Sequence, residues 1–196
     1  MKKSKKLDVI FLLDRSGSMS NCVNDTIGGY NNYLKEQKKN SNSLITTILF
    51  DNEYEVLYDR VPVNEVKKLT NKEYYVRGCT ALMDAIGKTI TNLEQKEPEK
   101  VLFIITTDGL ENASREYRKE HIKKLIEKHS DWEFLFIGAN IDSYAEGHSL
   151  GIKQDNIANY EQSTQGVSKL FRSLSKASYM MCEEEKINSK WKSDLN

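Results

Sequence analysis

Cysteine is scarce in this chain of 196 residues, which has three, at Cys22, Cys79 and Cys182. An odd number without paired spacing argues against a disulfide framework. Reduced thiols are typical of a cytoplasmic protein, so we expect a cytoplasmic location. Cys79 is expected to be a buried, inert thiol rather than a sensor of oxidation.

The sequence also lacks an excess of charge of either sign and a long apolar run. Lys and Arg total 29, as do Asp and Glu, so nothing favours nucleic acid or an acidic membrane as partner. No stretch approaches the roughly 18 apolar residues that a membrane span requires. The lysine-rich start resembles a secretory signal, but its apolar run, residues 9–13, ends early at Asp14. We expect a basic lead-in to a buried strand.

What the sequence does contain is an alternation of short apolar runs and amphipathic stretches. Val23, Ile27, Tyr30 and Leu34, for example, recur at helical spacing and form one apolar stripe. This alternation predicts an α/β fold: a Rossmann-like, doubly wound, mostly parallel six-stranded sheet with one antiparallel edge strand and helices on both faces. The predicted strands are 9–13, 44–50, 54–58, 101–105, 134–137 and 156–159, and the predicted helices are 23–34, one from 80, 115–128, 143–150 and 163–181.

The length of the chain predicts one domain with a short tail. We place the domain at residues 1–182 and a polar C-terminal tail at residues 183–196. Two alternatives are open for this tail: either it is mobile, or Trp191 anchors it to the body of the domain.

Three loops carry oxygen-bearing side chains that suit a metal ion. Asp14, Ser16 and Ser18 alternate directly after the first strand, Thr80 opens the second helix, and Asp108 follows the strand at 101–105. Loops at the carboxyl ends of parallel strands meet at one rim of the sheet, where such folds bind ligands. Oxygen ligands without sulfur or imidazole suit a hard cation, Mg²⁺ first and Mn²⁺ or Ca²⁺ as alternatives, and not Zn²⁺.

Several of these residues also have a purely structural interpretation. Ser18 or its neighbour Ser20 is suited to cap the N-terminus of the first helix, and Thr80 that of the second. Asp108 is suited to a turn. Glu111 and Asn112 lie near the same rim, where they either tune the site or are simply solvated. The metal interpretation is favoured because all three loops are expected at one edge of the sheet.

The pattern Asp14-x-Ser16-x-Ser18, with Thr80 and Asp108, resembles the metal-ion-dependent adhesion site (MIDAS) of von Willebrand A domains. The strings LLDRSGSM and TTDGLENAS strengthen the resemblance, which covers residues 7–180 and suggests an intracellular, bacterial or phage-type member. It implies direct metal binding by Ser16 and Ser18, and by Thr80 when a ligand is engaged. It also implies that Asp14 and Asp108 act mostly through metal-bound waters.

The resemblance implies a protein-binding module and not an enzyme. An open position on the Mg²⁺ would accept an Asp or Glu of a protein partner, with the chain a monomer or part of a hetero-complex. The alternative is a Mg²⁺-dependent hydrolase or phosphotransferase with Asp14 as nucleophile. Against it, Ser16 stands where the usual second acid would be, and the sequence has no P-loop or GxGxxG motif. A third hypothesis is a metal that only stabilises the fold.

The resemblance further implies a mobile last helix, at about residues 163–181. In von Willebrand A domains this helix shifts when the metal site engages a ligand, so two conformational states are expected. Comparison of liganded and free structures tests this prediction.

Overall fold

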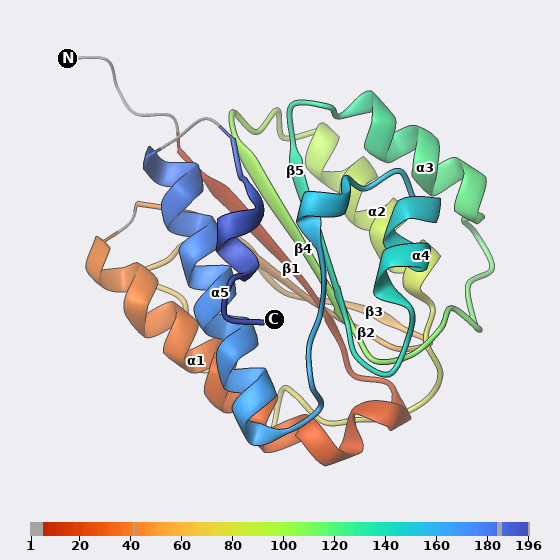
Figure 1. Ribbon diagram of the computed structural model, residues 1–196, viewed down its shortest axis with the longest axis horizontal. Helices are drawn as coiled ribbons and strands as arrows, with labels where there is room; N and C mark the ends of the chain where they lie inside the picture. Colours follow the sequence, from red (N-terminus) through yellow and green to blue (C-terminus); the bar gives the residue numbers. More distant parts are fainter. Residues whose placement is uncertain (1–5, 41, 184–185, 196) are drawn as a thin grey trace.

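A computed structural model describes residues 6–40, 42–183 and 186–195; residues 2–5 of the predicted basic lead-in lie outside this part. The described residues form three layers, with one sheet between two groups of helices (Figure 1). One face of the sheet is covered by α1 (Val23–Asn40) and α5 (Thr164–Glu183), and the other by α2 (Leu82–Glu94), α3 (Lys119–Lys128) and α4 (Ser143–Ser149).

The sheet has six strands in the order β3-β2-β1-β4-β5-β6. The edge strand β3 is antiparallel to β2, and the other neighbours are parallel, which confirms the predicted fold class. Helices on both faces explain why β1 and β4 are buried at every position. The strands are β1 (Asp8–Asp14), β2 (Leu44–Phe50), β3 (Tyr54–Pro62), β4 (Val101–Thr107), β5 (Glu133–Gly138) and β6 (Ile157–Asn159).

Helix α3 begins at Lys119, so the predicted start at Arg115 is wrong by four residues. The Asp84 carboxylate on α2 accepts hydrogen bonds from the backbone N–H groups of Arg115, Glu116 and Tyr117, at 2.8–2.9 Å. These three groups are therefore bound to a distant side chain, and the segment before α3 is held as a loop.

Helices α1 and α5 approach closely because α1 has a glycine at their contact. A β-carbon built on Gly29 would lie 2.1 Å from a ring carbon of Phe171. Farther along the same pair, the hydroxyl groups of Tyr33 and Ser178 are 2.7 Å apart. The packing of these two helices thus depends on the missing side chain at Gly29.

The C-terminal segment packs against the body of the domain. Trp191 is fully buried, and its indole N–H donates to the carbonyl of Asp155 at 2.9 Å. Lys192 donates to the carbonyl of Ile157 on β6 at 2.6 Å. Residues 186–195 therefore follow the alternative in which Trp191 anchors the tail to the domain. The domain boundary at residue 182 stays a prediction.

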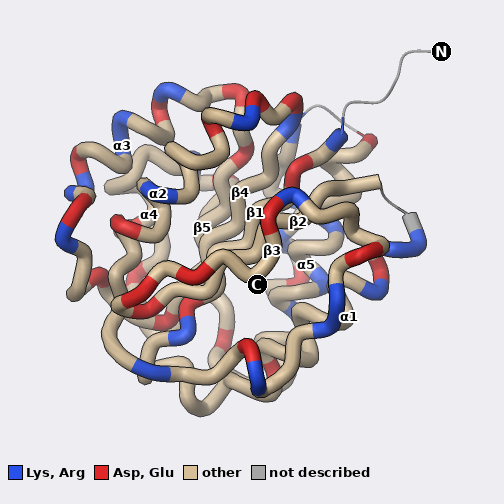
Figure 2. Tube along the Cα trace, turned by 180° about the vertical axis from the view of Figure 1, so that it is seen from behind, with Lys and Arg blue, Asp and Glu red and all other residues tan. Residues whose placement is uncertain are grey.

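Charges of both signs are mixed along the outer helices. Figure 2 shows Lys and Arg next to Asp and Glu along α1 and α3. Every helix among the described residues is too short or too polar to span a membrane.

Candidate metal site

The rim at the carboxyl ends of β1 and β4 brings distant loops together. Gly78 has a positive φ of 64°, and a β-carbon there would lie 2.1 Å from the side-chain oxygen of Asn52. The carbonyl of Gly78 accepts a hydrogen bond from the N–H of Gly17 at 3.1 Å. The loop that carries Thr80 therefore lies against the loop that follows β1. Cys79, predicted to be buried, is instead exposed at this turn.

Four of the five predicted metal residues lie together at this rim. The hydroxyl oxygens of Ser16 and Ser18 are 3.1 Å apart, and Ser18 donates to Asp108 Oδ1 at 2.5 Å. A β-carbon on Gly109 would lie 3.1 Å from Thr80 Oγ1 and 3.5 Å from Ser18 Oγ. The structure thus brings together residues that are up to 92 positions apart in the chain, from Ser16 to Asp108.

Asp14, the fifth residue, is fully buried behind these hydroxyl groups. Its Oδ1 accepts the N–H of Ser16 at 2.7 Å, and its Oδ2 accepts the Thr107 hydroxyl at 2.6 Å. Burial raises the pKa of Asp14 to about 6 against these hydrogen bonds, and the nearby Asp108 carboxylate adds to the rise. Burial also raises the pKa of Asp108. A cation here would stabilise the ionised form of both groups.

The helix-cap alternative is wrong for Ser18 and Thr80. Helix α2 begins at Leu82, two residues after the predicted start, and its N-cap position is Ala81 without a side-chain cap. Ser18 lies inside the short 3₁₀ helix η1 (Gly17–Cys22), whose N-cap residue Ser16 makes no capping hydrogen bond. The hydroxyl groups are therefore free of a capping role.

Asn112 is bound to the Thr80 loop and Glu111 to the start of α2, so neither residue is simply solvated. Asn112 Oδ1 accepts the N–H of Thr80 at 2.9 Å, and the N–H of Asn112 donates to the carbonyl of Thr80 at 3.1 Å. The Glu111 carboxylate accepts the N–H of Met83 at 2.9 Å. Both residues hold the loop of Asp108 against the start of α2.

Sequence reasoning missed Thr107, Asn140 and Gln162. Gln162 Nε2 donates to Asp108 Oδ2 at 2.7 Å and to the carbonyl of Ser18 at 3.3 Å. Asn140 Nδ2 donates to Gln162 Oε1 at 2.7 Å. Asn140 follows β5 and Gln162 follows β6, so the rule that placed the other residues at this rim would have included them.

The donor set fits a small, hard cation. Oxygen ligands of Mg²⁺ lie about 2.0–2.1 Å from the ion in an octahedron, so neighbouring ligands are about 3 Å apart. The separation of 3.1 Å between the Ser16 and Ser18 hydroxyls matches this geometry. Among the described residues there is no group of three or more His, Cys, Asp or Glu side chains suited to a metal. A metal at this rim therefore depends on the hydroxyl groups.

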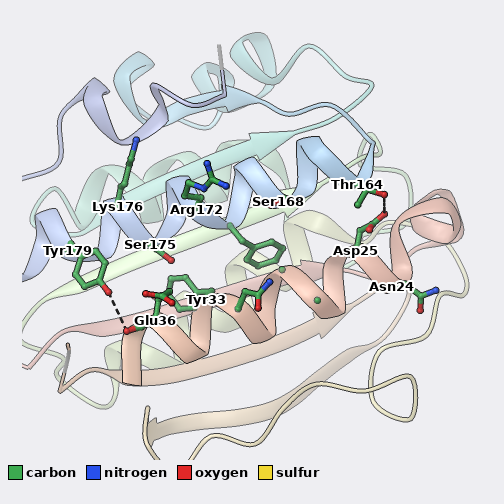
Figure 3. A pocket seen from close by; sticks show the side chains of 14 residues that line it. Asn24, Asp25, Tyr33, Glu36, Thr164, Ser168, Arg172, Ser175, Lys176 and Tyr179 are labelled. Atoms are coloured by element: carbon green, nitrogen blue, oxygen red, sulfur yellow. Dashed lines mark hydrogen bonds between the residues drawn. The ribbon is translucent and has the colours of Figure 1, made fainter. Parts of the chain in front are cut away.

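A separate groove of about 610 Å³ lies between α1 and α5 (Figure 3). Asp25 and Glu36 line it from α1, and Arg172 and Lys176 line it from α5. Thr164 donates to Asp25 at 3.2 Å across one end, as Figure 3 shows. None of the five predicted metal residues lines this groove, so the groove and the rim are distinct features.

No family model and no curated protein sequence matches the chain, but solved structures do. The vWF domain of the pili tip protein Mfa5 from Porphyromonas gingivalis aligns with a TM-score of 0.72 at 10% identity, over 95% of this chain and 99% of that one. A von Willebrand factor type A protein from Catenulispora acidiphila aligns with a TM-score of 0.60 at 13% identity, over 89% and 43%. The chain has the von Willebrand A fold.

A third structure with this fold, manganese-loaded TRAP from Plasmodium vivax, aligns with a TM-score of 0.58 at 18% identity, over 81% of this chain and 70% of that one. The chain spans less than half of the length of several matched proteins, including the one from Catenulispora acidiphila. At these identities the likeness shows the von Willebrand A fold and nothing of activity or partners.

Proposed function

We propose that the chain is a metal-dependent protein-binding module that holds Mg²⁺ at this rim and captures an Asp or Glu side chain of a partner protein. The observation that carries the proposal is the convergence of the hydroxyls of Ser16, Ser18 and Thr80 beside the Asp108 carboxylate. The manganese-loaded TRAP structure supports a divalent cation. Mn²⁺ and Ca²⁺ are the alternatives to Mg²⁺.

In this proposal each residue has one role. Ser16, Ser18 and Thr80 hold the cation through neutral hydroxyls, which leave its charge less compensated than carboxylates would. Asp14 and Asp108 orient the hydroxyls and bound waters around it. The bound cation supplies an electrophilic site for an anionic oxygen of the partner.

Exposed apolar side chains beside the rim support a protein as the partner. Leu110 is 57% exposed and directly follows Gly109, which lies against Thr80 and Ser18. Tyr75 is 44% exposed, and the centroid of its ring lies 5.5 Å from the guanidinium carbon of Arg15. Large apolar residues next to a charged site are typical of protein interfaces and are of no use for a small free anion.

The contacts of Asp14 favour binding over hydrolysis. A nucleophilic carboxylate must be accessible to its substrate, but the Asp14 side chain is fully buried and each of its oxygens accepts a hydrogen bond from the protein. Mg²⁺-dependent phosphatase turnover that Asp14→Asn abolishes would overturn the binding proposal. The cytoplasmic location, the monomer or hetero-complex and the shift of α5 stay predictions.

Calorimetric titration with Mg²⁺ tests the metal site, with Ser16→Ala as the variant and Ser20→Ala as its matched control. Ser20 is an exposed serine four residues away on η1. We expect Ser16→Ala to weaken Mg²⁺ binding at least tenfold and Ser20→Ala to change it less than twofold. A wild-type chain without saturable Mg²⁺ binding contradicts the proposal.

A capture experiment tests the partner. Immobilised wild-type chain is expected to retain a protein in Mg²⁺ and to release it in chelator, and the Ser16→Ala chain is expected not to retain it. Replacement of one Asp or Glu of the captured protein by Asn or Gln should abolish binding. Capture that persists in chelator would show that the metal is not involved. If chelator lowers the melting temperature of the chain but does not affect capture, the metal only stabilises the fold.

A further inference from the structure

We propose that Gln162 is a positioning residue of the metal site, which fixes the Asp108 carboxylate and is itself oriented by Asn140. This inference rests on the metal site proposed above and adds to it a residue outside the five-residue pattern. Gln162 lies between β6 and α5, on a loop that the pattern does not include.

Two donors from different loops fix the orientation of the Asp108 carboxylate. Ser18 Oγ donates to Asp108 Oδ1 at 2.5 Å, and Gln162 Nε2 donates to Asp108 Oδ2 at 2.7 Å. Because the two oxygens are bound by donors from different loops, the carboxylate plane has one orientation. Without the amide, Asp108 Oδ2 would lose its donor and the side chain could rotate away from Ser18.

The Gln162 amide is itself oriented by Asn140. A glutamine side chain can present either its NH₂ group or its oxygen to a neighbour. Asn140 Nδ2 donates to Gln162 Oε1 at 2.7 Å, which engages the oxygen and turns the NH₂ group toward Asp108. Asn140 has a positive φ of 56°, an uncommon conformation for a residue other than glycine, at the point where the chain leaves β5.

The Gln162 amide joins two loops of the site. Its Nε2 donates to the carbonyl of Ser18 at 3.3 Å as well as to Asp108, so it contacts both the serine loop and the Asp108 loop. It carries no charge, so it fixes the ligand oxygens without adding to or removing from the net charge of the site. Preorganised donors lower the cost of ordering a metal site, which predicts tighter metal binding with Gln162 than without it.

Mg²⁺ titration of Gln162→Leu, with Gln165→Leu as control, tests this inference. Gln165 is exposed in the first turn of α5, so the same substitution there keeps the rim intact. We expect the Mg²⁺ dissociation constant to rise three- to tenfold in Gln162→Leu and to stay within twofold in Gln165→Leu. In chelator, amide hydrogen exchange at residues 108–110 should be faster in Gln162→Leu only, which is a readout that does not involve the metal.

Asn140→Ala tests whether Asn140 orients the Gln162 amide. It also replaces Gln162→Leu as the test variant if Gln162→Leu fails to fold. It should weaken Mg²⁺ binding less than Gln162→Leu does, and the double variant should match Gln162→Leu alone, because Asn140 acts through Gln162. Fully additive effects would overturn the link to Asn140. If Gln162→Leu and Asn140→Ala both bind Mg²⁺ like wild type while Ser16→Ala does not, Gln162 has no positioning role and the proposed function stands. A wild-type chain that binds no Mg²⁺ overturns both.

Discussion

Asp14 shows how single residues at the rim depend on neighbours that the metal pattern does not name. Its carboxylate is fully buried, and its Oδ2 accepts a hydrogen bond from the hydroxyl of Thr107, the last residue of β4. A buried carboxylate oxygen without a donor is costly, so Thr107 is needed to keep Asp14 in place. The sequence contained Thr107 in the string that marked Asp108, but its role depends on strand pairing.

Thr107→Val should therefore affect both stability and metal binding. We expect the free energy of unfolding in chelator to fall by about 1–3 kcal/mol, because Asp14 Oδ2 loses its buried donor, and Mg²⁺ binding to weaken severalfold. Thr106→Val is the matched control, because the Thr106 hydroxyl donates to the backbone carbonyl of Leu12 instead. It should cost about 1 kcal/mol in urea unfolding and leave Mg²⁺ affinity within twofold. Equal loss of Mg²⁺ affinity in both variants would contradict this role for Thr107.

At the scale of elements, the strands and helices follow from local patterns, and their boundaries depend on distant contacts. The strand at 44–50 was predicted with its observed bounds, because a short apolar run between polar segments is a local signal. The start of α3 was not, because Asp84 on α2 binds the three N–H groups before it. No local pattern in residues 115–118 indicates that contact.

Asp84→Asn should lower the stability of the domain at neutral pH and have little effect on it in acid. Burial opposes ionisation of Asp84, but three backbone donors outweigh it and lower its pKa. A lowered pKa in the folded state means that the carboxylate stabilises the fold above its unfolded pKa, about 4, and loses this effect as the pH falls through the folded value. We expect Asp84→Asn to be less stable by about 1–3 kcal/mol at pH 7 in urea unfolding. The difference should shrink below about pH 4, and a constant difference down to pH 2 would refute the assignment.

Two adjacent glycines on α1 should respond in opposite ways to alanine. A β-carbon on Gly28 has no atom within 4 Å, so Gly28→Ala should stabilise the domain by about 0.5–1 kcal/mol through helix propensity. A β-carbon on Gly29 would clash with Phe171, so Gly29→Ala should destabilise it by about 1–3 kcal/mol. Thermal and urea unfolding of the pair measure both effects. Stabilisation by Gly29→Ala would show that α1 and α5 can separate at no cost.

Across the molecule, the rim forms because five strands of the sheet run parallel and their carboxyl ends lie at the same end. Residues 14–18, 78–80, 108–112 and 162 lie far apart in the chain, and β1, β4 and β6 deliver three of these four segments to one end of the sheet. The C-terminal segment is held against the domain by Trp191, whose indole N–H donates to a carbonyl in the segment before β6. The described part of the C-terminal segment thus belongs to the packing of the domain.

Trp191→Ala should destabilise the whole domain. The side chain is fully buried, so its loss should cost about 3–5 kcal/mol in the free energy of unfolding. Lys190→Ala is the control, because Lys190 is exposed and the change should stay within about 0.5 kcal/mol. Urea unfolding distinguishes the two, and a Trp191→Ala chain as stable as wild type would mean that the C-terminal segment contributes nothing to the core.

The fold class could be predicted from the sequence, because apolar periodicity is a local property. The five candidate metal residues could be named because their pattern resembles the adhesion-site motif. The side chains that hold those residues in place are evident only from contacts in three dimensions. Thr107, Asn112 and Gln162 reach the rim through strand pairing and loop contacts. These contacts join residues that are far apart in the chain, and a local pattern carries no information about such pairs.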